Sequence, residues 1–188
     1  MSKLGRKVSA LLLATSVVIS TVVPAFAANS PTTGNTPTGT PVAATDGAST
    51  VEGTTTGDTT AAVNKVSSTD KTAVIPNTIK ANSKDYLVDE IKTGTIKDKY
   101  NKVTMILNST TKVDAQVAQS KKAKKTKKIV IQAADGQKLK AAKFNKKAFK
   151  GFKGKIVVKK SAMSKKEFNK LKKKLKKGGF KGKISRVK

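Results

Sequence analysis

The sequence contains no cysteine, no histidine and no tryptophan. Without cysteine the chain can form neither a disulfide nor a thiolate nucleophile, and it cannot carry a lipid on an N-terminal cysteine. Without histidine it also lacks an imidazole for acid–base catalysis, and the side chains that hold most zinc ions are missing. These absences disfavour the enzyme classes that depend on such groups, so the main question is what the chain binds.

Arginine and carboxylates are scarce, whereas lysine is abundant. The 188 residues include 40 basic and 11 acidic ones, a net charge of +29, and only Arg6 and Arg186 are arginines. Residues 28–119 are neutral overall, while residues 120–188 carry 27 lysines and Arg186 against two carboxylates, a net +26. Lysine presents a hydrated point charge and lacks the planar fork with which arginine binds phosphates and bases. The composition therefore favours diffuse attraction to polyanions over site-specific recognition.

Residues 1–27 have the features of a secretory signal peptide. A segment with three basic residues precedes a mostly apolar stretch, and Ala25-Phe26-Ala27 matches the cleavage pattern. The apolar stretch is shorter than the ~20 residues that a membrane-spanning helix needs. We therefore predict cleavage after Ala27 and a protein that is secreted or associated with the cell surface or cell wall. No transmembrane segment is expected after removal of the signal.

Residues 28–72 consist mainly of Thr, Ala, Gly, Ser, Asn and Pro, with no aromatic residue. Such a segment buries too little apolar area to compensate for the entropy lost on ordering. We therefore expect a disordered linker, or stalk, between the signal peptide and a folded domain at residues 73–188, of which residues 120–188 are the lysine-rich half.

Short β-favouring runs begin near Ile75. The runs at 75–79 and 86–88 flank the polar segment 81–85, a pattern that predicts a β-hairpin. Four further runs follow, each preceded by a lysine, and they start at Val103, Ile129, Ile156 and Ile184. Their starts lie 26, 27 and 28 residues apart, and a near-constant period of this size is typical of a repeat.

The segment before the last run predicts a helix near residues 165–177. Ser164 and Glu167 fit a capping box, in which each side chain satisfies a free backbone N–H group of the other residue. Phe168, Leu171 and Leu175 then follow at helical spacing, and Gly178-Gly179 ends the pattern.

The stretch Lys-Lys-Ala-Phe-Lys-Gly-Phe-Lys-Gly-Lys-Ile-Val-Val at 146–158 resembles the core of BspA-like leucine-rich repeats of bacterial surface proteins. Residues 159–188 resemble the basic C-terminal end of such arrays, and residues 75–91 resemble the hairpin that often opens them. The resemblance implies an α/β-type repeat fold: a short leucine-rich-repeat-like solenoid of about four strands, with a C-terminal capping helix. It also implies extracellular display and adhesive or protein-binding roles, and it supplies no catalytic residues.

We therefore expect a monomeric, non-enzymatic binding or adhesion module of the bacterial cell surface, with no cofactor and no metal. Its partners would be anionic polymers, such as teichoic acid or sulfated glycans, or a protein of the surface or of a host. The candidate polyanion-binding residues are Lys121, Lys122, Lys124, Lys125, Lys127, Lys128, Lys172, Lys173, Lys176 and Lys177. The alternative is a histone-like protein that binds nucleic acid without sequence specificity, because lysine tracts bind DNA by releasing counterions.

Overall fold

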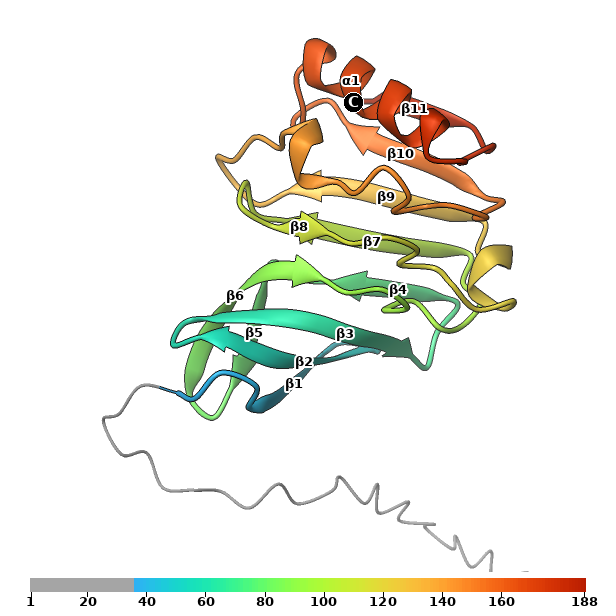
Figure 1. The fold of residues 1–188 in the computed structure, drawn as a ribbon. Helices are drawn as coiled ribbons and strands as arrows, with labels where there is room; N and C mark the ends of the chain where they lie inside the picture. The colour runs from blue at the N-terminus through green and yellow to red at the C-terminus, as the bar shows by residue number, and fades with distance from the viewer. Residues whose placement is uncertain (1–35) are drawn as a thin grey trace, which may run out of the picture. The chain divides into compact units, whose positions relative to one another are not determined.

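The computed structural model describes residues 36–188, which build two β-sheets and, within that range, a single α-helix (Figure 1). Strands make up 42% of the structure and helical segments only 12%, so the fold is mostly β. One continuous hydrophobic core includes buried residues from both sheets and from the helix. The predicted signal peptide, residues 1–27, lies outside the described residues.

The first sheet has six strands and curls until it is nearly closed. Its order is β1 (Pro41–Asp46), β2 (Ser49–Gly57), β3 (Thr60–Ser68), β6 (Lys84–Ile91) and β5 (Thr78–Ala81), and β8 (Lys112–Val113) also pairs with β6. Strands β1, β2 and β3 are antiparallel neighbours, whereas β3 and β8 each run parallel to β6. The two end strands, β1 and β5, approach each other across the remaining seam.

The prediction of a disordered linker at residues 28–72 is wrong from residue 36 onward, because this part forms β1, β2 and β3. Burial alternates along β2, where Ser49, Val51, Gly53 and Thr55 point inward. A strongly curled sheet needs small and β-branched residues inside: at Gly53 an added Cβ would lie 2.3 Å from the Ala62 carbonyl oxygen. The composition rule counts large apolar residues and therefore overlooks a core of this kind.

The predicted hairpin is confirmed, as β5 and β6 pair in antiparallel register with Ile79 opposite Tyr86. Asn82 and Ser83 form its turn with φ of 52° and 59°, the left-handed conformation that two-residue hairpin turns require. Both Ile79 and Tyr86 are buried, so this hairpin helps to close the curled sheet.

The second sheet is entirely parallel, in the order β11 (Ile184–Val187), β10 (Lys155–Lys159), β9 (Lys128–Ala133), β7 (Lys102–Leu107) and β4 (Thr72–Ile75). The starts of the four sequence runs are direct neighbours, since Val103 pairs with Ile129, Ile129 with Ile156, and Ile156 with Ile184. The spacing of 26 to 28 residues is therefore the length of chain between adjacent parallel strands.

The predicted α/β leucine-rich-repeat-like solenoid is wrong, because the chain folds as two sheets and only one connection of the second sheet contains an α-helix. The connection from β4 to β7 contains the hairpin β5–β6, and those entering β9 and β10 contain short 3-10 turns, η1 (Ala123–Lys125) and η2 (Ala141–Lys143). A sequence period reports which strands are neighbours, but it says nothing of the chain between them. The segment that was expected to be unfolded supplies half of the first sheet.

The predicted helix is present as α1 (Lys165–Lys177), with Glu167 donating its backbone N–H to the Ser164 hydroxyl at 3.2 Å. Phe168, Leu171 and Leu175 are buried. The helix connects parallel strands β10 and β11, and the free edge of the sheet is β11 itself. It is therefore the crossover connection between these strands, and it packs on the preceding connection at η2.

The loops that enter β10 and β11 share the sequence Gly-Phe-Lys-Gly-Lys-Ile, at 151–156 and 179–184. The Phe152 and Phe180 rings stack with centroids 6.2 Å apart. An added Cβ at Gly154 would lie 2.2 Å from the Thr126 carbonyl oxygen, and one at Gly182 would lie 2.4 Å from the Gly154 carbonyl oxygen. Successive loops therefore stack backbone on backbone, which only glycine permits at these positions.

A chain that begins at Ala73 should lose cooperative unfolding, because removal of β1 to β3 exposes the buried side chains of Ile79, Val88 and Ile91. A chain that begins at Thr36 should keep it. The measurement is urea unfolding followed by circular dichroism. Equal midpoints and slopes for the two chains would show that the first three strands contribute nothing to the core.

The substitution Gly154→Ala should destabilise the fold by about 1–3 kcal/mol, because the new methyl group overlaps the backbone oxygens of the preceding loop. The matched control is Gly57→Ala, whose added Cβ would meet only the Thr60 hydroxyl, at 2.9 Å. Thermal unfolding should separate the two variants by several degrees. A Gly154→Ala variant as stable as the control would mean that the loops are not stacked this closely.

Candidate functional site

The lysine-rich loops of the second half gather at one end of the parallel sheet, the end at which its strands begin. Because all its strands run the same way, the segments that enter β9, β10 and β11 lie side by side. Backbone hydrogen bonds link them: Lys155 N donates to Lys127 O at 2.9 Å, Lys153 N to Lys124 O at 3.2 Å, and Ile156 N to Lys183 O at 2.9 Å. We call this end of the sheet, formed by residues 120–128, 150–155 and 177–183, the basic edge.

The two carboxylates of the basic half lie at the other end of the sheet, beyond the C-terminal ends of its strands. Asp135 follows the end of β9, and Glu167 lies in the first turn of α1, after the end of β10. Glu167 accepts hydrogen bonds from Ala141 N at 2.8 Å and from Lys170 Nζ at 2.9 Å, and the bond from Lys170 lowers the pKa of Glu167. Within residues 36–188 the only ion pair of the basic half is Lys170–Glu167. The basic edge therefore holds its positive charge without compensation from a carboxylate of that half.

The ten lysines predicted to bind polyanions fall into two groups. Lys121 to Lys128 lie on the basic edge, where Lys121, Lys122, Lys125 and Lys127 are exposed and Lys124 and Lys128 are half-buried. The other four are exposed on α1, and Asn169, Lys172, Lys173 and Lys176 line a shallow hollow of about 390 Å³.

Lys176 joins the helical group to the basic edge. Its Nζ donates to Gly182 O at 2.8 Å and lies 5.5 Å from the centre of the Phe180 ring. Lys176 and the adjacent Lys177 therefore lie beside the loop that enters β11, whereas Lys172 and Lys173 lie further along the helix. Lys176 also has a structural role, because it satisfies backbone carbonyls of that loop.

Sequence reasoning missed Lys150 on this edge and, with it, four further exposed lysines, Lys153, Lys155, Lys181 and Lys183. These four come from the repeated Gly-Phe-Lys-Gly-Lys-Ile segments, which stand beside the tract at 121–128 only after the parallel sheet forms. The recurrence of a lysine before each β run was the available signal.

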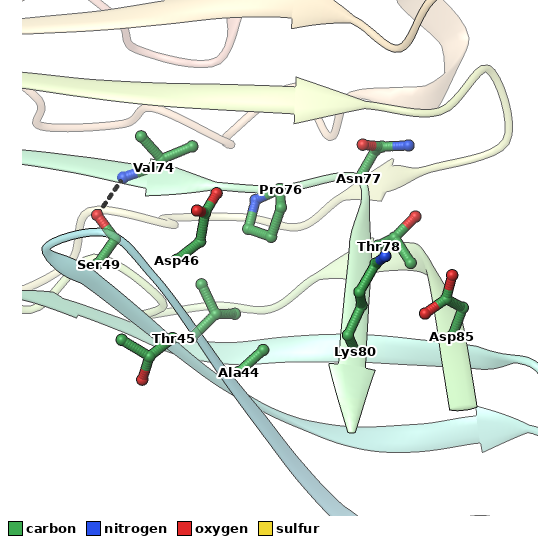
Figure 2. A pocket seen from close by; sticks show the side chains of 11 residues that line it. Ala44, Thr45, Asp46, Ser49, Val74, Pro76, Asn77, Thr78, Lys80 and Asp85 are labelled. Atoms are coloured by element: carbon green, nitrogen blue, oxygen red, sulfur yellow. Dashed lines mark hydrogen bonds between the residues drawn. The ribbon is translucent and has the colours of Figure 1, made fainter. Parts of the chain in front are cut away.

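A second hollow, of about 470 Å³, lies at the seam of the curled sheet, between β1 and β2 on one side and β4, β5 and the start of β6 on the other (Figure 2). Val51, Val74 and Pro76 supply apolar wall, and Val74 N donates to the Ser49 hydroxyl at 3.0 Å. Asp46, Asp85 and Lys80 supply its charges. Sequence reasoning missed this hollow, because one of its walls comes from the segment that was predicted to be disordered.

A small group of charged side chains gathers where β6 pairs with β8. Glu90 pairs with Lys92 at 2.6 Å, and the hydrogen bond between them raises the pKa of Lys92. Asp114 lies just beyond β8, and burial, followed by the charge of Glu90, raises the pKa of the Asp114 carboxyl. Two carboxyl groups and a lysine thus meet on the curled sheet, although they line neither hollow.

The neighbouring carboxylate, Asp89, lies apart from this group and accepts a hydrogen bond from the Thr56 hydroxyl at 2.9 Å. Its second oxygen is buried and has no hydrogen-bond partner among the described residues.

No group of acidic side chains within residues 36–188 is arranged to hold a metal ion. In the same range, no helix has the length and apolar character needed to cross a bilayer.

Comparison with known proteins matches no family model, no curated protein and no solved structure. The resemblance of residues 146–158 to BspA-like repeats therefore stays a prediction.

The substitution Asp114→Asn should raise the melting temperature at neutral pH, on the order of 1–2 °C. A carboxyl whose folded-state pKa is raised above its unfolded value destabilises the fold when ionised, and this cost disappears as the pH falls below the unfolded pKa. The difference between variant and parent should therefore be largest near pH 7 and shrink towards pH 4 in calorimetry. A variant that melts below the parent at pH 7 would contradict this account of Asp114.

Proposed function

We propose that this protein is an exported, non-enzymatic binding module whose lysine-rich half attaches it to anionic polymers of a cell envelope or a host surface. The observation that supports this most directly is the gathering of lysines at the basic edge. Loops from three consecutive connections each bring lysines to this edge, whereas Asp135 and Glu167, the two carboxylates of this half, lie at the other end of the strands.

The exposure of these lysines favours a polymer over a small anion. Most of them are exposed and none on the basic edge belongs to an ion pair within residues 36–188. An exposed lysine binds a small anion weakly, because water screens both charges. A polymer gains affinity at every contact by releasing its condensed counterions, so many weak contacts add up.

The surface chemistry disfavours nucleic acid, the alternative partner. Proteins that bind single strands stack bases on exposed aromatic rings, and each aromatic residue within 36–188 is buried. Arg186, the only arginine in this range, donates to the backbone oxygens of Met163 and Lys160. DNA binding in a test tube would therefore rest on charge alone.

The experiment compares two variants that each lose four exposed lysines. The edge variant carries Gln at Lys121, Lys122, Lys125 and Lys127, and the control carries Gln at Lys140, Lys160, Lys165 and Lys166, away from the basic edge. Binding to heparin is measured over a range of salt concentrations. For the edge variant the slope of log affinity against log salt should become shallower by about 3, because each lost contact between a lysine and an anionic group removes ~0.7–0.9 from the slope. The control should keep the slope of the parent.

Equal changes in the two variants would mean that net charge alone, and not the basic edge, drives binding. A parent protein that fails to bind heparin at low salt would refute the proposed function. A DNA duplex that binds more tightly than heparin at physiological salt would favour the histone-like alternative.

A further inference from the structure

Four lysines lie at the first residue of, or directly before, four adjacent parallel strands. Lys128 pairs directly with Lys155, and Lys102 and Lys183 immediately precede the paired residues Val103 and Ile184. Lys102, Lys155 and Lys183 are exposed and Lys128 is half-buried. We call these four residues the lysine column. Because neighbouring strands lie ~4.8 Å apart, the column is about 14 Å long and runs across the strands.

The column has an energetic cost that the fold does not offset. Like charges directly opposite each other on neighbouring strands destabilise a sheet. Within residues 36–188 no lysine of the column forms an ion pair. A cost of this kind, repeated in four strands, is typical of a surface that meets an anionic partner.

A second row lies beside the column on the same face of the sheet. On β7, β9 and β10 the residues two positions after the column lysines are Thr104, Val130 and Val157, which are paired in register. On β11 this position is Ser185, and at its other end the row extends to Val74 of β4, which pairs with Thr104. These β-branched side chains form a flat strip, which we call the valine row, ~7 Å from the column. Val130, in the middle, is only 7% exposed, whereas Val74, Thr104 and Val157 are half-buried, so these three side chains supply the surface that a ligand can contact.

Building on the proposed function, we propose that the lysine column and the valine row form one binding track for a linear anionic polysaccharide that lies across the strands. The acidic groups of the polymer contact the column, and the C–H faces of its sugar rings pack on the valine row. A polyphosphate chain has charge but no apolar face, so it would use only the column. Single-stranded nucleic acid would need exposed aromatic rings on which to stack its bases, and the aromatic residues within 36–188 are buried.

The stacked loops explain why the column stays straight. Gly154 and Gly182 allow each loop backbone to contact the preceding one, so the strands that follow start at the same level. Lys155 and Lys183 each come directly after one of these glycines. The repeated Gly-Phe-Lys-Gly-Lys-Ile segment therefore sets the spacing of the charges as well as the packing of the loops.

The first test compares the column variant, Lys102→Gln with Lys155→Gln and Lys183→Gln, with the control Lys140→Gln, Lys160→Gln and Lys165→Gln, whose lysines lie away from the basic edge and the column. All six lysines are exposed, so both variants should fold and lose the same charge. The probes are heparin oligosaccharides of graded length in 0.15 M salt, a concentration at which exposed charges are screened beyond ~8 Å. The column variant should bind about tenfold or more weakly than the control. It should also melt at or above the temperature of the parent, because like-charge repulsion is relieved.

Affinity for the parent should rise with oligosaccharide length until the chain spans the column, and then level off. Equal losses in the two variants would overturn the lysine column as the track and leave the proposed function intact. Absence of heparin binding by the parent would instead refute the proposed function.

The second test addresses the valine row. Val157→Thr keeps the shape and β-branching of the side chain but makes it polar, and Val187→Thr is the control at an exposed valine outside the row. Val157→Thr should weaken heparin binding severalfold and leave binding of linear polyphosphate unchanged, while the control should change neither. Equal effects of Val157→Thr on both polymers, or no effect on heparin, would overturn the assignment to a polysaccharide.

Discussion

The close approach of backbone to backbone at Gly154 and Gly182 is the constraint on which the second half of this protein depends. Parallel strands lie ~4.8 Å apart, and the loops that enter them must stack at the same distance. A single methyl group at either position would overlap a carbonyl oxygen of the loop before it. Because the loops stack, the Phe152 and Phe180 rings align beneath them and the next strands start in register.

Because of this constraint, the abundant lysines take defined positions on the surface of the protein. A chain with a net charge of +29 would attract polyanions in any conformation. In this fold three loops bring lysines together at the basic edge, and four strands align one lysine each. Some surface lysines also bind parts of the protein itself, as Lys176 binds the carbonyl of Gly182 and Lys174 that of Ala141.

The elements predicted from the sequence are those encoded by neighbouring residues. The capping box at Ser164, the hairpin around 81–85 and the strand starts at Val103, Ile129 and Ile156 all depend on local patterns, and the structure contains them. The buried face of the parallel sheet was readable for the same reason, since large apolar residues alternate along its strands.

The errors arise where the fold depends on distant or small residues. Residues 41–68 lack large apolar side chains, yet their valines, alanines and glycines fit the inside of a curled sheet, which composition could not reveal. The hollow at the seam of the curled sheet was missed for the same reason. The solenoid was predicted wrongly because the spacing of the β runs does not show how the chain folds between them. The perturbed Asp114 needed the pairing of β8 with β6 to bring it near Glu90.

The register of the lysine column can be measured directly, because the chain has no native cysteine. Cysteines in place of Lys128 and Lys155, which are Cα partners, would lie within the 4.4–6.8 Å that a disulfide spans. Cysteines in place of Lys128 and Val157 would be about 8 Å apart, beyond that range. Mild oxidation followed by non-reducing mass analysis should therefore give an intramolecular disulfide in the first pair and not in the second. Equal cross-linking of both pairs, or of neither, would contradict the alignment of these lysines.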